Sequence, residues 1–193
     1  KCNQGLAQAF YTGINASLAL GADIIVNTDG DHQYPGSFIP ELIQPILDKR
    51  ADVVIGNRNP ASNLGFSPIK RILQVIGSWV VQNLSGSQVP DAASGFRAYS
   101  SYAASRIQVT NNFSYTLETL IQAGNDKMSV AFVPVETNNQ TRPSRLHKGI
   151  LNFIWVQAFI ILRSYVLYQP LRTFGALSIL FMSIGLVPWV RFL

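Results

Sequence analysis

The sequence predicts an α/β fold with a mostly parallel open sheet, followed by interfacial and transmembrane helices at the C-terminal end. Over residues 1–140, short apolar runs rich in β-branched residues alternate with longer runs of helical spacing. Such alternation is typical of a parallel sheet with helices on both faces. Residues 141–193 carry six Lys or Arg and no acid, and they include two uncharged apolar stretches. This second composition indicates a different environment for the end of the chain.

The helices and strands of the first part follow from periodicity and from the residues that end regular structure. Residues 5–20 have apolar side chains at helical spacing and stop at Gly21, which predicts a helix. Further helices are expected at 38–49, where Pro45 should kink or interrupt the helix, and at 69–84 and 114–124. Apolar, β-branched runs predict strands at residues 22–28, 51–56, 95–99 and 128–135.

Two uncharged stretches dominate the C-terminal part. Residues 149–162 are too few to span a bilayer, which needs about 20 residues, so we expect a basic linker and an interfacial amphipathic helix over 141–172. Residues 174–190 approach the lower limit for spanning, and Trp189 with Arg191 resembles an interface anchor. We therefore predict a transmembrane helix over 173–193. Two buried helices of a soluble domain remain the alternative.

The charge distribution bears on the partners of the chain. Residues 1–140 carry nine Lys or Arg against ten Asp or Glu, so the basic balance belongs to the apolar tail. Basic residues that flank apolar segments favour an anionic membrane surface over nucleic acid. The single cysteine, Cys2, excludes an internal disulfide and suits a reducing compartment.

Two carboxylates separated by one glycine follow the first expected strand. Side chains at i and i+2 of an extended segment share a face, so Asp29 and Asp31 can converge on one hard cation. Gly30 between them lets the backbone approach a ligand. A divalent ion held there suits a diphosphate leaving group. The alternative is a solvated turn, because Asp-Gly pairs are ordinary turn residues.

The segment Asp29-Gly30-Asp31 resembles the Asp-X-Asp segment of family-two glycosyltransferases with the GT-A fold, and further motifs follow in the order of that family. These are Asn3-Gln4-Gly5, Gly56-Asn57-Arg58, Asp91-Ala92-Ala93-Ser94-Gly95-Phe96-Arg97, and Val133-Pro134-Val135 with Arg142-Pro143-Ser144-Arg145. Arg145 stands where the family commonly has Lys, and Pro143 falls beside the family's glycine. The resemblance covers about residues 1–150. It implies a Rossmann-like nucleotide-sugar transferase in which residues 1–140 are a partial catalytic domain lacking its first strands.

The resemblance also implies roles for individual residues. Asp29 and Asp31 would bind the donor and a divalent ion, Mg²⁺ or Mn²⁺, and Asp31 is expected to be catalytic. Asp91 matches the family's catalytic base; the alternatives are that it orients the acceptor, pairs with Arg97 or caps its loop. Arg58 is expected to contact the donor and the acceptor phosphate, and Arg97 to be structural. The other expected ligands of the acceptor phosphate are Arg71, Arg142, Ser144 and Arg145.

Within the family, the apolar tail is most similar to polyprenyl-phosphate glycosyltransferases, and the Gln-X-X-Arg-Trp signature of processive synthases is missing. This implies an inverting enzyme that moves a sugar from a UDP- or GDP-linked donor to undecaprenyl or dolichyl phosphate. The expected location is the plasma (inner) membrane or the endoplasmic reticulum membrane, with the catalytic domain facing the cytoplasm. Two alternatives stay open: a soluble family-two glycosyltransferase, and a truncated, inactive membrane-anchored fragment. A homo-oligomer is also left open.

Overall fold

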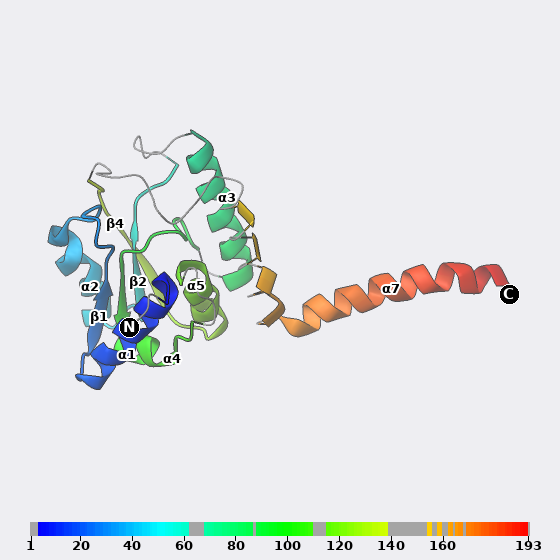
Figure 1. The fold of residues 1–193 in the computed structure, drawn as a ribbon, viewed down its shortest axis with the longest axis horizontal. Coiled ribbons are helices and arrows are strands. Elements are labelled where there is room, and N and C mark those ends of the chain that lie inside the picture. The colour runs from blue at the N-terminus through cyan, green and yellow to red at the C-terminus, as the bar shows by residue number, and fades with distance from the viewer. Residues whose placement is uncertain are drawn as a thin grey trace.

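A four-stranded mixed sheet forms the centre of the molecule (Figure 1). Its strands are β1 (Ile24–Asn27), β2 (Val53–Asn57), β3 (Arg97–Ser100) and β4 (Val130–Pro134), in the order β1-β3-β2-β4. The computed structural model describes residues 4–61, 68–86, 88–109 and 115–138, short parts of 154–167, and residues 169–192. All four expected strands are present, each shorter by one or more residues than expected or shifted by one or two.

The expectation of a mostly parallel sheet is wrong for β3. Strands β2 and β4 are parallel, but β3 lies between β1 and β2 and runs antiparallel to both. The physical reason is the place at which the chain re-enters the sheet. The loop before β3 leads the chain into the sheet at the edge where β2 ends, so β3 runs in the opposite direction to β2. A strand–helix–strand pattern does not specify that edge, so the sequence pattern could not predict the reversal.

Helices cover both faces of the sheet. One core packs α2 against side chains such as Val54 and Ala98, and the other packs α1, α4 and α5 against side chains such as Ile55 and Tyr99. These strand residues alternate between the two faces, as the pleat of a strand requires. The helices are α1 (Leu6–Ala19), α2 (Ile39–Leu47) after a 3-10 turn η1 (Gly36–Phe38), α3 (Pro68–Ser85), α4 (Ser101–Arg106), α5 (Thr116–Asn125) and α7 (Pro170–Phe192).

The four helices expected before residue 125 are confirmed, with α3 one residue longer at each end than expected. Pro45 lies inside α2, which continues to Leu47, so this proline does not interrupt the helix. Helix α4 was not expected from periodicity because it spans only six residues. Its beginning is fixed by the Ser100 hydroxyl, which accepts a hydrogen bond from the Ala103 amide (3.1 Å).

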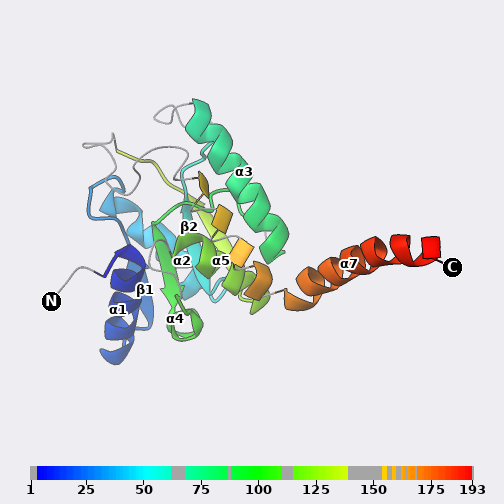
Figure 2. The ribbon, with the colours of Figure 1, turned by 45° about the vertical axis from the view of Figure 1, so that its right-hand side comes forward.

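Helix α7 projects away from the domain that contains the sheet as a separate rod (Figures 1 and 2). Its described apolar side chains are exposed along its length, including Leu171, Phe181 and Trp189. Among the helices of the described residues, none combines the length and the hydropathy needed to cross a bilayer. The transmembrane helix predicted over 173–193 is therefore not confirmed.

Gly124 allows α5 to pack closely against α3. A Cβ atom at this position would overlap the backbone oxygen and the Cβ of Ser85. We predict that Gly124→Ala lowers the free energy of unfolding by about 1–3 kcal/mol, the usual cost of overpacking. Urea denaturation measures this change.

The matched control is Gly13→Ala in α1, where no atom lies within 4 Å of an added Cβ. This change should be neutral or stabilise the protein by up to about 1 kcal/mol through helix propensity. Equal effects of the two substitutions would contradict the close packing of α3 on α5.

Candidate active site

Most of the candidate site residues that the structure describes gather at one edge of the sheet. This edge, called the site edge below, is formed by the carboxyl ends of β1, β2 and β4 and the amino end of β3. Asp29 follows β1, Arg58 follows β2, and Asp91 and Gly95 precede β3. In open α/β sheets, ligands bind beyond the carboxyl ends of the parallel strands. The site edge is therefore where the fold favours a ligand.

Asp29 and Asp31 lie in the loop between β1 and η1. The pKa of Asp29 is raised, first by burial and then by the negative charge of Asp31, while Arg58 and Arg97 act in the opposite direction. Asp31 accepts a hydrogen bond at Oδ1 from the backbone amide of Gln33 (3.1 Å), which orients its carboxylate. Two neighbouring carboxylates that repel each other form a place where a cation is stabilised.

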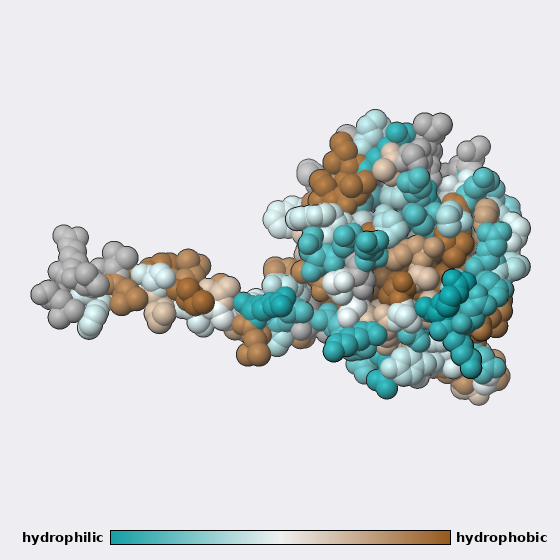
Figure 3. Space-filling model, turned by 180° about the vertical axis from the view of Figure 1, so that it is seen from behind, coloured by the Kyte–Doolittle hydropathy of each residue, from teal (hydrophilic) through white to brown (hydrophobic). Residues whose placement is uncertain are grey.

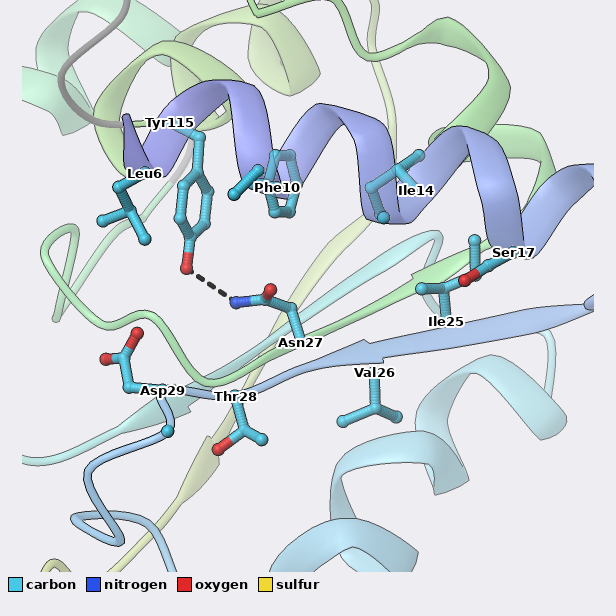
Figure 4. A pocket seen from close by; sticks show the side chains of 13 residues that line it. Leu6, Phe10, Ile14, Ser17, Ile25, Val26, Asn27, Thr28, Asp29 and Tyr115 are labelled. Atoms are coloured by element: carbon cyan, nitrogen blue, oxygen red, sulfur yellow. Dashed lines mark hydrogen bonds between the residues drawn. The ribbon is translucent and has the colours of Figure 1, made fainter. Parts of the chain in front are cut away.

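The surroundings of Asp29 depend on Gly95. A Cβ atom at Gly95 would lie 2.8 Å from Oδ2 of Asp29 and 3.1 Å from the Tyr115 hydroxyl, so only glycine leaves room for this carboxylate. Asn27 holds Gly95 and Tyr115 in place beside Asp29, because its Nδ2 donates to the Gly95 carbonyl (2.8 Å) and to the Tyr115 hydroxyl (2.6 Å; Figure 4). The Tyr115 ring stacks on Phe10 of α1, with ring centroids 4.0 Å apart.

These contacts form one wall of a pocket of about 310 Å³ between α1 and β1. The pocket ends at Asp29 and Gly30, and its apolar part is lined by side chains such as Leu6, Phe10 and Ile25 (Figure 4). Asn27 and Tyr115 were not predicted from the sequence as site residues. Asn27 had a signal, since it ends the strand two residues before Asp29, whereas nothing in its local sequence marked Tyr115.

Arg58 and Asp91 form a buried ion pair. The guanidinium donates from Nε to Oδ2 (2.7 Å) and from Nη2 to Oδ1 (2.8 Å), and the Arg58 amide also donates to Oδ2 (3.1 Å). Asp91 is fully buried and Arg58 is 8% exposed. Burial alone would lower the pKa of Arg58, but the bonds to Asp91 and nearby charges outweigh it and raise the pKa. Arg58 therefore stays charged, and both oxygens of Asp91 are engaged.

Arg97 is fully buried and holds the loop before β3. It donates to the carbonyls of Ala92 and Ser94 on that loop (2.8 Å each) and to the Thr116 carbonyl at the start of α5 (2.8 Å). Its role is structural, as expected from the sequence. Asp91 pairs with Arg58 and not with Arg97, which corrects the sequence-based alternative for this carboxylate.

The remaining expected phosphate ligands are placed only in part. Arg71 lies in the first turn of α3 and is partly buried. Arg142, Ser144 and Arg145 lie outside the described residues. Within the described ranges, no group of three or more His, Cys, Asp or Glu residues gathers in a way that could hold a metal ion. The pair Asp29 and Asp31 nevertheless suits Mg²⁺ or Mn²⁺, because such ions are held by one or two carboxylates together with substrate phosphates.

The family model described as glycosyl transferase family 2 matches residues 1–107. The chain therefore belongs to this family. One similar curated protein is the UDP-N-acetylglucosamine–dolichyl-phosphate N-acetylglucosaminyltransferase of Methanococcus voltae, 31% identical over 140 residues, which cover 70% of this chain and 56% of that protein. The dolichyl-phosphate hexose transferase of Haloferax volcanii is 28% identical over 140 residues, covering 72% and 61%. The chain thus spans between half and two thirds of the length of these relatives.

The fold is also similar to that of a solved enzyme. Glucosyl-3-phosphoglycerate synthase from Mycobacterium tuberculosis, crystallised with phosphoglyceric acid, aligns with a TM-score of 0.62 and 16% identity over 87% of this chain and 56% of that one. A structure of the same enzyme with Mn²⁺, UDP-glucose and phosphoglyceric acid aligns with a TM-score of 0.60. At this identity the likeness supports the fold alone.

The buried pair of Arg58 and Asp91 should be strongly coupled. We predict that Asp91→Leu or Arg58→Met alone lowers the free energy of unfolding by about 3–5 kcal/mol, because each leaves a buried charge without its partner. The double variant should recover most of this loss. Denaturant unfolding of the four proteins gives the coupling energy.

The exposed pair of Arg50 and Asp48 is the matched control. Its cycle should show little coupling, because water screens exposed ion pairs. Independent, additive effects of the Arg58 and Asp91 substitutions would contradict the buried pairing.

Proposed function

We propose that the chain is the catalytic part of a membrane-associated, inverting glycosyltransferase that moves a sugar from a UDP- or GDP-linked donor to a polyprenyl phosphate. The main support is the convergence at the site edge of Asp29 with Asp31, which suit a cation and a diphosphate, and of the permanently charged Arg58. The curated relatives named above act on dolichyl phosphate, which supports the class of acceptor.

The residues of the site divide the chemistry between them. Asp29 and Asp31 would hold Mg²⁺ or Mn²⁺, which when bound neutralises charge on the departing nucleoside diphosphate. An oxygen of the lipid phosphate attacks the anomeric carbon as the bond from that carbon to the diphosphate breaks, so the configuration inverts. Most of the rate acceleration is expected from positioning and electrostatic stabilisation.

The burial of Asp91 fits a positioning role and not that of a strong base. A lipid phosphate is already largely ionised near neutral pH, with a second pKa of about 6 by analogy with phosphoserine, so the reaction needs no strong base. Asp91 engages two nitrogens of Arg58 and its backbone amide. We infer that Asp91 sets the position of Arg58 toward the phosphates. Arg71, Arg142, Ser144 and Arg145 are proposed to complete the acceptor site.

Helix α3 supports the membrane part of the proposal, because part of the helix exposes apolar residues while polar residues of the same helix are buried. Its buried positions include the polar residues Gln74, Ser78 and Ser85, whereas an exposed stripe consists of Ile72, Val75, Ile76 and Trp79. These four follow the i, i+3, i+4, i+7 spacing of one helix face. The helix contains Lys70 and Arg71 and no acidic residue. A basic helix with an exposed apolar stripe suits an anionic lipid surface.

The apolar surface continues beyond α3. Viewed from behind, hydrophobic residues gather at the top of the domain, where Figure 1 places α3, and along much of α7 (Figure 3). Trp155 and Phe159, between these helices in the sequence, are also exposed. We propose that α3 and α7 rest on or in the plasma (inner) membrane or the endoplasmic reticulum membrane, with the catalytic domain facing the cytoplasm.

The metal role of Asp31 predicts a specific loss. Asp31→Ala should lower kcat/KM for metal-dependent sugar transfer to polyprenyl phosphate by about 100-fold or more, since charge stabilisation at the leaving group is lost. A radiolabelled transfer assay with a panel of UDP- and GDP-sugars measures this. Asp48→Ala, at an exposed carboxylate after α2, is the control and should keep full activity. Undiminished turnover of Asp31→Ala would reject the metal role.

The lipid-facing role of α3 predicts a loss of membrane binding. Ile76→Glu and Trp79→Glu should each weaken binding to vesicles of phosphatidylcholine with phosphatidylglycerol by about tenfold, because a charge replaces buried apolar area. Co-sedimentation measures the partition of the full protein. Leu47→Glu, at an exposed apolar residue of α2, is the control and should bind as the unmodified protein does. Unchanged vesicle binding by Ile76→Glu and Trp79→Glu would contradict the lipid-facing role of α3, and absence of binding by every protein, the unmodified one included, would favour the soluble alternative.

A further inference from the structure

The segment after β4 reaches across the site edge to the loop that carries Asp31. Strands β4 and β1 lie at opposite sides of the sheet. After Pro134 the chain first continues along β2, where the Val135 amide donates to the Asn57 carbonyl (2.9 Å). Three residues later it contacts the loop after β1. The backbone amide of Asn138 donates to the Gln33 carbonyl (2.9 Å), and its side-chain Nδ2 donates to the His32 carbonyl (3.0 Å).

The loop that Asn138 contacts has a conformation that needs support. His32 has φ of 60°, in the left-handed region that non-glycine residues seldom adopt. On one side, Asp31 holds this turn through the bond from the Gln33 amide to its Oδ1 (3.1 Å). On the other side, Asn138 binds the carbonyls of the two residues that follow Asp31. The turn is thus fixed from both ends, and a conformation of this kind persists only where the surroundings determine it.

We propose that Asn138 is a positioning residue that holds the carboxylate of Asp31 in the orientation required for the metal and the donor diphosphate. This inference rests on the proposed function, because it assigns the metal role to Asp31. Asn138 itself is exposed and carries no charge, so it acts through the backbone of His32 and Gln33 and not on the substrate.

The position of Asn138 in the chain gives this contact a second consequence. Arg142 and Arg145, the proposed acceptor ligands, follow within seven residues. The hydrogen bonds of Asn138 therefore tie the loop of the proposed metal site to the chain segment that leads, in the sequence, to these arginines.

The test is a metal titration of the purified full protein. Asn138→Ala keeps the backbone donor but removes Nδ2, and we expect its affinity for Mn²⁺ in the presence of UDP or GDP to fall about five- to tenfold, as for one lost hydrogen bond. Electron paramagnetic resonance of free Mn²⁺ measures this. Asn138→Asp, which has the same shape but cannot donate, should bind Mn²⁺ no better than Asn138→Ala. Saturating Mn²⁺ should restore kcat in Asn138→Ala.

Two further variants make the outcomes distinct. Asn83→Ala is the matched control, since the Asn83 side chain donates within α3, to the Trp79 carbonyl (2.8 Å), and the Mn²⁺ affinity of this variant should not change. Asp31→Ala should lose the site altogether. If Asp31→Ala binds Mn²⁺ as the unmodified protein does, the proposed metal function fails and this inference with it. If only Asp31→Ala is impaired while Asn138→Ala is not, the proposed function stands and the role of Asn138 is overturned.

A purely structural role for Asn138 gives a different result. In that case the unfolding midpoint of Asn138→Ala would fall, and kcat would stay low at every Mn²⁺ concentration. This outcome would also overturn the positioning role.

Discussion

The buried ion pair of Arg58 and Asp91 is the interaction on which the rest of the site depends. It joins the end of β2 to the loop before β3, and that loop also contains Gly95, the residue that leaves space for Asp29. Arg97 fixes the same loop from inside through backbone carbonyls. Because a buried charge without a partner is costly, loss of either residue alone would disturb the burial of the two loops against each other.

The site edge has both negative and positive side chains, whose charges a ligand of mixed charge would neutralise. Burial and the charge of Asp31 raise the pKa of Asp29, and Arg58 and Arg97 offset this only in part. A cation near the two carboxylates and an anionic diphosphate near Arg58 would each meet an opposite charge. This pairing of charges is the basis of the proposed role of the site in metal-dependent nucleotide-sugar transfer.

A second constraint comes from the apolar residues that are exposed on the outer surface of the molecule. Helix α3 places polar residues inside and an apolar stripe outside, and α7 exposes apolar residues along its length. Exposure of apolar surface to water is unfavourable in proportion to the exposed area, and large exposed apolar patches mark interaction sites. Arg71, in the first turn of α3, lies on the helix that carries this stripe.

The sequence by itself determined the strands, the helices α1, α2, α3 and α5, and the family, because periodicity, β-branched runs and ordered motifs are local properties of the chain. It also singled out Asp29, Asp31, Arg58 and Asp91 as candidates, and the structure places them in the loops at the site edge. Only the tertiary structure decided that β3 is antiparallel, that Asp91 pairs with Arg58, and that Asn27, Tyr115 and Asn138 belong to the site edge. These features depend on which edge the chain re-enters and on contacts between residues far apart in the sequence, and apart from the position of Asn27 at the end of β1 no local pattern encodes them.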